Sequence, residues 1–293
     1  MLGKLFKYEW KGFRFPILIM LIVLVGTTAL TCGVLLSINP QYDDAFRGFS
    51  VSSLILSIFL YYFGIIGCSL GVVLVIAIRF YKTCYSDNGY LTHTLPVSTQ
   101  KILNVKIISS FIAVMLMTLA VAATMFIIIN VGINHIVSIA LTEEGYKNFR
   151  NIEEARREFF KEFSSFFGSF KDVFGISLGS YIAYMIVYYI IAAISNIVTV
   201  LGCVSLGQLY AKHRVIGAII AYFVVQFIMQ ILMRFAMIPM YGRMMSKVGS
   251  HEKTTIFGFM MPTMNLILLL LVIMAVIMYL INLYMMTKKL NLE

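Results

Sequence analysis

Long apolar runs alternate with short polar segments along the chain. Each run reaches the ~20 apolar residues that a helix needs to cross a bilayer, and a helix also satisfies its own backbone hydrogen bonds in lipid. The pattern therefore predicts an all-α membrane protein with six transmembrane helices. These spans are expected at residues 15–38, 53–78, 107–131, 176–206, 215–233 and 257–286.

Composition supports this class of protein. Hydrophobic residues make up 60% of the chain and charged residues only 12%, whereas soluble domains carry about 25% charged residues. The net charge is +10, but a nucleic-acid binder needs a soluble basic face. Here the cations flank apolar runs, which is typical of topology signals and of contact with anionic lipids. We therefore expect membrane lipids as partners and no nucleic acid.

The polar segments divide the chain into an N-terminal helix and a membrane domain. Residues 1–14 place apolar side chains on one helical side and lysines on the other, with Trp10 among them. This pattern predicts an amphipathic helix lying in the membrane interface, although an ordinary basic flank of the first span would look similar. Residues 15–293 form the six-helix transmembrane domain, with a long external loop at 134–175.

The distribution of Lys and Arg orients the chain. Counted over the short loops, these residues are more numerous on the side of the N-terminus, which is the cytoplasmic side by the positive-inside rule. We therefore expect a multi-pass protein of the cell membrane with both termini in the cytoplasm. The four basic residues of the fifth loop, Arg234, Arg243, Lys247 and Lys253, run against this rule.

Motifs for catalysis and for tightly held cofactors are missing from the sequence. It contains no GxxxxGK[ST] phosphate loop, no HExxH and no GxSxG. No Asp or Glu lies within an expected span, which argues against a proton-coupled transporter. The four histidines fall in four different loops and the four cysteines form no CxxC pair. We therefore expect no catalytic residues, no metal and no cofactor.

One span carries a polar strip. Gln226, Gln230 and Arg234 recur at four-residue spacing and so share one face of the fifth span. Hydrogen bonding between helices is the simpler interpretation, with the arginine reaching the outer interface. The alternative is that Gln226 and Gln230 line a substrate path.

The second polar loop contains a short amphipathic segment. The turn signal Asn88–Gly89 is followed by a short segment with an apolar face, and a proline then ends the expected helix. The residues of this segment are Tyr90, Leu91, Thr94, Leu95 and Pro96. An apolar patch facing the cytoplasm is unfavourable unless another surface buries it. Either lipid or a partner protein could supply that surface.

Three segments resemble those of one transporter family. They are Met1-Leu-Gly-Lys-Leu-Phe-Lys-Tyr-Glu-Trp10, Tyr90-Leu-Thr-His-Thr-Leu-Pro-Val-Ser98 and Ser205-Leu-Gly-Gln-Leu-Tyr-Ala-Lys-His-Arg214. In their order and their places among six spans, they resemble the ABC-2-type transporter permeases of Gram-positive bacteria. The long third loop matches no motif of that family.

This resemblance implies a partner and a docking surface. Such permeases pair with a second permease subunit, as homodimers or heterodimers, and dock separate ABC ATPase subunits. The resemblance assigns docking to the N-terminal helix and to a short cytoplasmic coupling helix; the residues concerned are Glu9, Lys11, Tyr90, Leu91, Thr94, Leu95 and Pro96. It also implies a re-entrant segment at 236–256.

The function expected from the resemblance is the membrane-spanning subunit of an ATP-driven exporter. Its substrate would be a peptide, a lipid or a drug, and ATP would be hydrolysed by the partner chain. The alternative is a non-ABC integral membrane protein, such as a channel, a scaffold or a lipid-modifying enzyme.

The expected topology can be tested by cysteine labelling. In a variant lacking the native cysteines, Ser86→Cys and Lys212→Cys should react only with reagent on the cytoplasmic side. Asn151→Cys should react only from outside, because it lies in the long external loop. Labelling of Asn151→Cys from the cytoplasm would show that the number of spans or their orientation is wrong.

Overall fold

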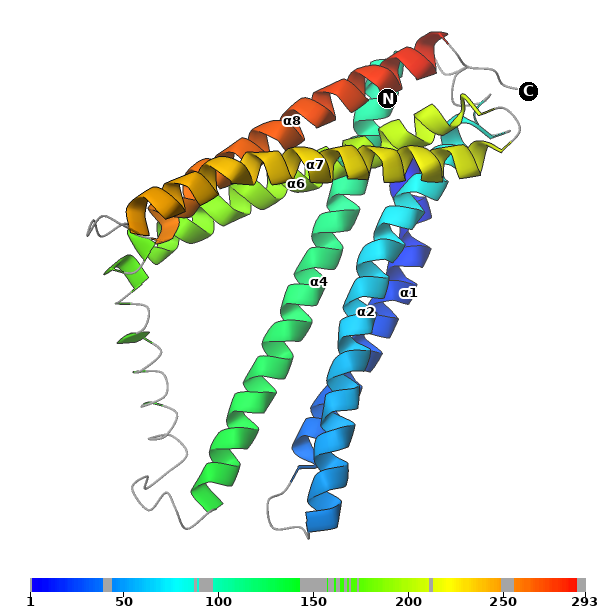
Figure 1. Cartoon of the computed structure of the whole chain (residues 1–293). Coiled ribbons are helices and arrows are strands. Elements are labelled where there is room, and N and C mark those ends of the chain that lie inside the picture. The colour runs from blue at the N-terminus through cyan, green and yellow to red at the C-terminus, as the bar shows by residue number, and fades with distance from the viewer. Residues whose placement is uncertain are drawn as a thin grey trace. The chain divides into compact units, whose positions relative to one another are not determined.

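The computed structural model is mainly helical in the part of the chain that it describes. That part comprises residues 2–38, 44–86, 89, 97–142, 157, 161, 164–165, 168, 170–172, 174–210, 213–248 and 256–288. Within these ranges no strand occurs. The helices are α1 (Leu2–Leu36), α2 (Asp44–Cys84), α4 (Thr99–Thr142), α6 (Leu178–Gly207), α7 (Arg214–Val248) and α8 (Ile256–Lys288) (Figure 1).

The six expected spans are confirmed as helices. Each of these helices contains a stretch long and apolar enough to cross a membrane, and many large apolar side chains on them are exposed, such as Phe15, Phe63, Leu119 and Phe223. Exposed apolar surface of this extent is stable in lipid but not in water. The chain is therefore a multi-pass, all-α membrane protein.

Several helices continue past the boundaries expected from the sequence. α2 extends beyond the expected 53–78 at both ends, and α4 extends beyond 107–131 as far as Thr142, so it takes in the first residues of the expected external loop at 134–175. α1 runs without a break from the N-terminal segment into the first span, with Pro16 inside the helix. α7 likewise continues through Pro239 as far as Val248, and the rest of the segment at 236–256 lies mostly outside the described residues. Helix continuity does not locate the bilayer, so the interfacial helix and the re-entrant segment stay predictions.

By internal packing the chain divides into two compact units. One comprises Met1–Trp10, Val73–Phe111 and Phe166–Glu293, and the other comprises Lys11–Val72 and Ile112–Ser165. Three helices, α1, α2 and α4, contribute to both units. The first unit contains the N-terminal turns of α1, the end of α2, the start of α4 and all of α6, α7 and α8.

In the first unit, α6 is the central helix. It packs against both α7 and α8, which also contact each other, and the three run side by side (Figure 1). Its second half, from Ala193 to Gly207, holds its buried residues. Val198 and Cys203 of α6 form a core there with Val225 of α7 and Met278 of α8.

A close approach of backbones sets the turn between α6 and α7. A Cβ added to Gly217 would lie only 2.9 Å from the carbonyl oxygen of Gly207, and one added to Gly207 would meet the backbone of Ala218. Only glycine fits both positions. Gly207 belongs to the third segment that resembles the permease family, and Gly217 follows that segment by three residues, so the segment leads into a tight helix–helix turn.

In the second unit, polar side chains join the helices. The Thr31 hydroxyl of α1 donates to the Ser57 carbonyl oxygen of α2 at 3.2 Å. The Tyr61 hydroxyl of α2 hydrogen-bonds the Thr124 hydroxyl of α4 at 3.0 Å. Hydrogen bonds of this kind commonly hold membrane helices together, because an unpaired polar group is costly in lipid.

Candidate functional site

The candidate site begins with a carboxylate on the apolar side of α1. Lys4, Lys7 and Lys11 are exposed, whereas Glu9 is only 5% exposed. Glu9 lies four residues after Leu5, and a four-residue step returns to the same face of a helix. The helix that carries lysines outward therefore carries this carboxylate inward.

Two cations meet the Glu9 carboxylate, one from α2 and one from α4. Lys106 Nζ lies 2.6 Å from Oε1, and Arg79 Nη2 lies 3.2 Å from Oε2. Arg79 Nη2 also donates to the Glu9 carbonyl oxygen at 3.0 Å. We call Glu9, Arg79 and Lys106 the charge cluster; all three belong to the first unit.

Residues of α2 complete the surroundings of Lys106. Its ammonium group donates to the Thr83 hydroxyl, and it lies 5.9 Å from the centre of the Phe80 ring. Thr83 is one turn after Arg79 and donates to the Arg79 carbonyl oxygen at 2.7 Å. One turn of α2 thus supplies the Arg79 guanidinium that meets Glu9. The same turn supplies the Thr83 hydroxyl that accepts a hydrogen bond from Lys106.

The charge cluster is buried, and this burial determines how much the cluster contributes to the stability of the protein. The side chains of Lys106 and Glu9 are 5% and 7% exposed, and that of Arg79 is 20% exposed. Forming such a cluster contributes little net stability, because removing charges from water is costly. Breaking it is costly, however, since a charge is then left buried without its partner. The cluster therefore fixes which helices stay together.

A chain of polar groups connects the end of α2 with α6 and α8. The Ser205 hydroxyl of α6 donates to Asn282 Oδ1 of α8. Because its single proton is used there, the Tyr85 hydroxyl must be the donor in its 2.7 Å hydrogen bond with Ser205 Oγ. Burial raises the pKa of Tyr85 well above its usual range, which keeps this donor protonated. We call Tyr85, Ser205 and Asn282 the polar chain.

Asn282 is fully buried and only partly satisfied. Its exposed fraction is 0%, and its amide nitrogen has no hydrogen-bond partner among the described residues. An unsatisfied buried donor costs about 1–3 kcal/mol. The polar chain is therefore a specific junction of three helices held at some cost in stability.

The expected docking residues fall in two groups. Glu9 is buried and its carboxylate is engaged by the charge cluster, whereas Lys11, two residues further along α1, is exposed. Tyr90, Leu91, Thr94, Leu95 and Pro96 lie outside the described residues. The docking role of all these residues stays a prediction. The structure adds that Glu9 acts within the chain by joining α1 to α2 and α4.

The expected substrate-path residues lie on α7. Gln226 is partly buried and Gln230 is exposed. Neither belongs to the charge cluster or to the polar chain. Their role in a substrate path stays a prediction.

Sequence reasoning missed the charge cluster and the polar chain. A signal for the cluster existed, because Glu9 interrupts the apolar face of an otherwise amphipathic helix and so needs a buried cation. The polar chain gave a weaker signal, since Ser205 and Asn282 are single polar residues in long apolar runs.

The arrangement is suited to joining helices rather than to catalysis. Within the part of the chain that the structure describes, no group of three or more His, Cys, Asp or Glu residues could hold a metal ion. Comparison with protein-family models, with curated proteins and with solved structures found no match to this chain. Function must therefore be argued from the cluster, the polar chain and the sequence.

The importance of the charge cluster can be tested with Glu9→Gln. This change keeps the size of the side chain but leaves Lys106 and Arg79 together without a carboxylate. Removing one partner of a buried ion pair costs about 3 kcal/mol or more, so the thermal midpoint in detergent should fall markedly. A thiol-reactive dye can report unfolding, because Cys84 is fully buried beside Thr83. Lys7→Gln, an exposed change on the same helix, is the control; equal midpoints for the two variants would contradict the role of the cluster.

Proposed function

We propose that this chain is the membrane-spanning permease subunit of an ATP-driven exporter of the ABC-2 type. It would work with a second permease subunit and with a separate ABC ATPase. Support comes from its six candidate membrane spans and from the three segments that resemble such permeases. The substrate class stays open among peptides, lipids and drugs.

The observation that carries the proposal is the buried charge cluster. In permeases of this family the ATPase docks on an N-terminal interfacial helix and on a coupling helix in the first cytoplasmic loop. Here Glu9 belongs to the N-terminal helix, Arg79 lies near the end of α2, and Lys106 lies near the start of α4. Residues 85–98 connect those two helices. The cluster therefore ties one proposed docking element to both ends of the other.

The polar chain gives a path from the docking loop into the rest of the first unit. Tyr85 directly follows α2, at the beginning of the loop. Its hydrogen bond to Ser205 of α6, and the bond from Ser205 to Asn282 of α8, link the loop to two further spans. A displacement of the loop by the ATPase would then be passed to α6 and α8 through fixed hydrogen bonds, and not through a flexible tether.

In this proposal the ATPase subunit carries out ATP hydrolysis. The permease would contribute binding, coupling and the transport path, and the partner chain would contribute the phosphate-binding loop and the hydrolytic residues. A buried charge cluster suits such a role, because it resists separation of its helices while they move together.

The proposal is tested by the double variant Leu91→Asp/Leu95→Asp. These residues are four apart, so they share one face if the loop forms the expected helix. Charges placed on a buried apolar contact are desolvated, and truncating an anchor at an interface commonly costs about 2 kcal/mol. We expect the double variant to lose association with an ABC ATPase encoded beside this chain, measured by pull-down in detergent at matched membrane expression.

The control for this experiment is Leu209→Asp. Leu209 is exposed in the turn after α6, so it adds a charge without touching the proposed docking surface. Recovery of the ATPase by the control and not by the double variant would support docking at the loop. Equal recovery by both would remove the docking role from the loop, and failure of the wild-type chain to recover any ATPase would favour a non-ABC membrane protein.

A further inference from the structure

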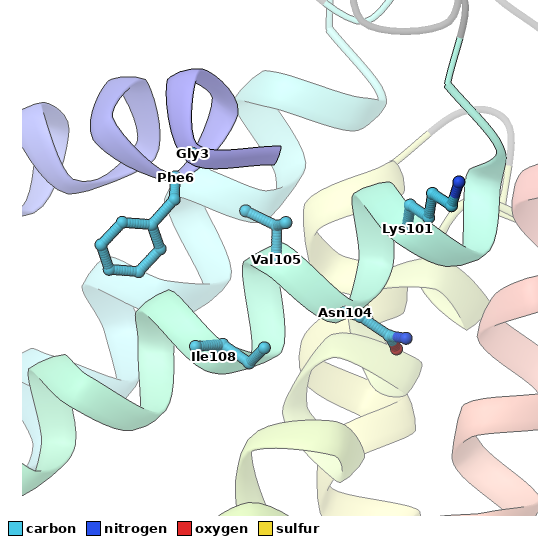
Figure 2. A pocket seen from close by; sticks show the side chains of 6 residues that line it. All are labelled: Gly3, Phe6, Lys101, Asn104, Val105 and Ile108. Atoms are coloured by element: carbon cyan, nitrogen blue, oxygen red, sulfur yellow. The ribbon is translucent and has the colours of Figure 1, made fainter. Parts of the chain in front are cut away.

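A groove lies between the N-terminal turns of α1 and the first turns of α4. It is lined by Gly3 and Phe6 of α1 and by Lys101, Asn104, Val105 and Ile108 of α4, and its volume is about 350 Å³ (Figure 2). All six residues belong to the first unit. The volume is at the small end of the range for ligand pockets, which suits one hydrocarbon chain and not a folded peptide.

The groove is lined almost entirely by apolar atoms, and Lys101 lies at one end of it. Phe6, Val105 and Ile108 provide the apolar wall, and Ile108 is 53% exposed. Lys101 and Asn104 lie toward the start of α4 (Figure 2). The Asn104 amide oxygen accepts a hydrogen bond from the Tyr279 hydroxyl at 2.9 Å. The Asn104 side chain is therefore directed toward α8.

The charge at this end of the groove is positive. Lys101 is exposed and forms no ion pair within the described residues. Lys4 and Lys7, the chain neighbours of the lining residues Gly3 and Phe6, are also exposed. Glu9 is the only acidic residue in the first 14 positions, and its carboxylate is engaged by Arg79 and Lys106. The surroundings therefore favour an anion.

We propose that this groove binds an anionic phospholipid of the bilayer. One acyl chain lies against Phe6, Val105 and Ile108, and the phosphate lies beside Lys101. Basic pockets next to transmembrane helices are suited to anionic lipid headgroups. A free phosphate would leave the apolar wall exposed, and a zwitterionic lipid would not use the surplus positive charge. This proposal does not depend on the exporter function.

The chain contains its own reporter for this site. Trp10 is the only tryptophan, and its ring stacks on that of Phe6, with centroids 6.4 Å apart and the planes at 9°. Bromine atoms on a lipid acyl chain quench tryptophan fluorescence at short range. A lipid chain in the groove would therefore quench Trp10 more strongly than its share of the bilayer predicts.

The experiment uses the full chain in bilayers of phosphatidylglycerol and phosphatidylcholine. In one series the phosphatidylglycerol is brominated, and in the other the phosphatidylcholine is brominated at equal mole fraction. We expect phosphatidylglycerol to be preferred roughly fivefold, which corresponds to the ~1 kcal/mol of one basic residue near anionic lipid. Equal quenching in the two series would overturn the proposal.

Three variants locate the binding. Lys101→Gln should bring the preference close to one, whereas Lys82→Gln, an exposed change in the last turn of α2, should keep it. Gly3→Leu should also abolish the preference, because a side chain there meets no atom within 4 Å and so extends into free space in the groove. Equal losses with Lys101→Gln and Lys82→Gln would show general attraction to the membrane surface. An unchanged preference with Gly3→Leu would show that no acyl chain occupies the groove.

Discussion

A carboxylate removed from water must find a cation, and the Glu9 side chain meets two. Because those cations come from α2 and α4, the requirement fixes the N-terminal turns of α1 against the end of one helix and the start of another. Apolar packing alone would do this less specifically, since lipid and leucine are almost equally good neighbours for an apolar helix face. The Glu9 side chain thus selects the two helices against which the N-terminal turns of α1 lie.

Further polar contacts of the first unit extend from the same end of α2. Thr83 supports Lys106, and Tyr85 connects to Ser205 and Asn282. In a protein surrounded by lipid, each such bond is specific, because few other partners exist. The residues that follow α2, the N-terminal turns of α1 and the central helix α6 are therefore joined by defined bonds.

Much of the fold could be predicted from the sequence, because the bilayer imposes a simple rule on length and polarity. The six spans follow from apolar runs alone. The apolar runs did not predict that α1 is continuous through residue 14, because an amphipathic segment and a span can share one helix or be joined by a bend. The inward position of Glu9 was readable from its spacing to Leu5, but its pairing with Arg79 and Lys106 was not, because those residues are 70 and 97 positions away. Tertiary packing alone selects such partners.

A double-mutant cycle measures whether Glu9 and Lys106 stabilise the chain as a pair. The thermal stability of Glu9→Gln, Lys106→Met and the combined variant would be compared with that of the wild type in one detergent. Contacting residues in one network commonly couple by about 0.5–3 kcal/mol. We predict a coupling in that range, so that the double variant is more stable than the sum of the single losses implies. Additive losses would show that the two residues act independently, and would contradict the account.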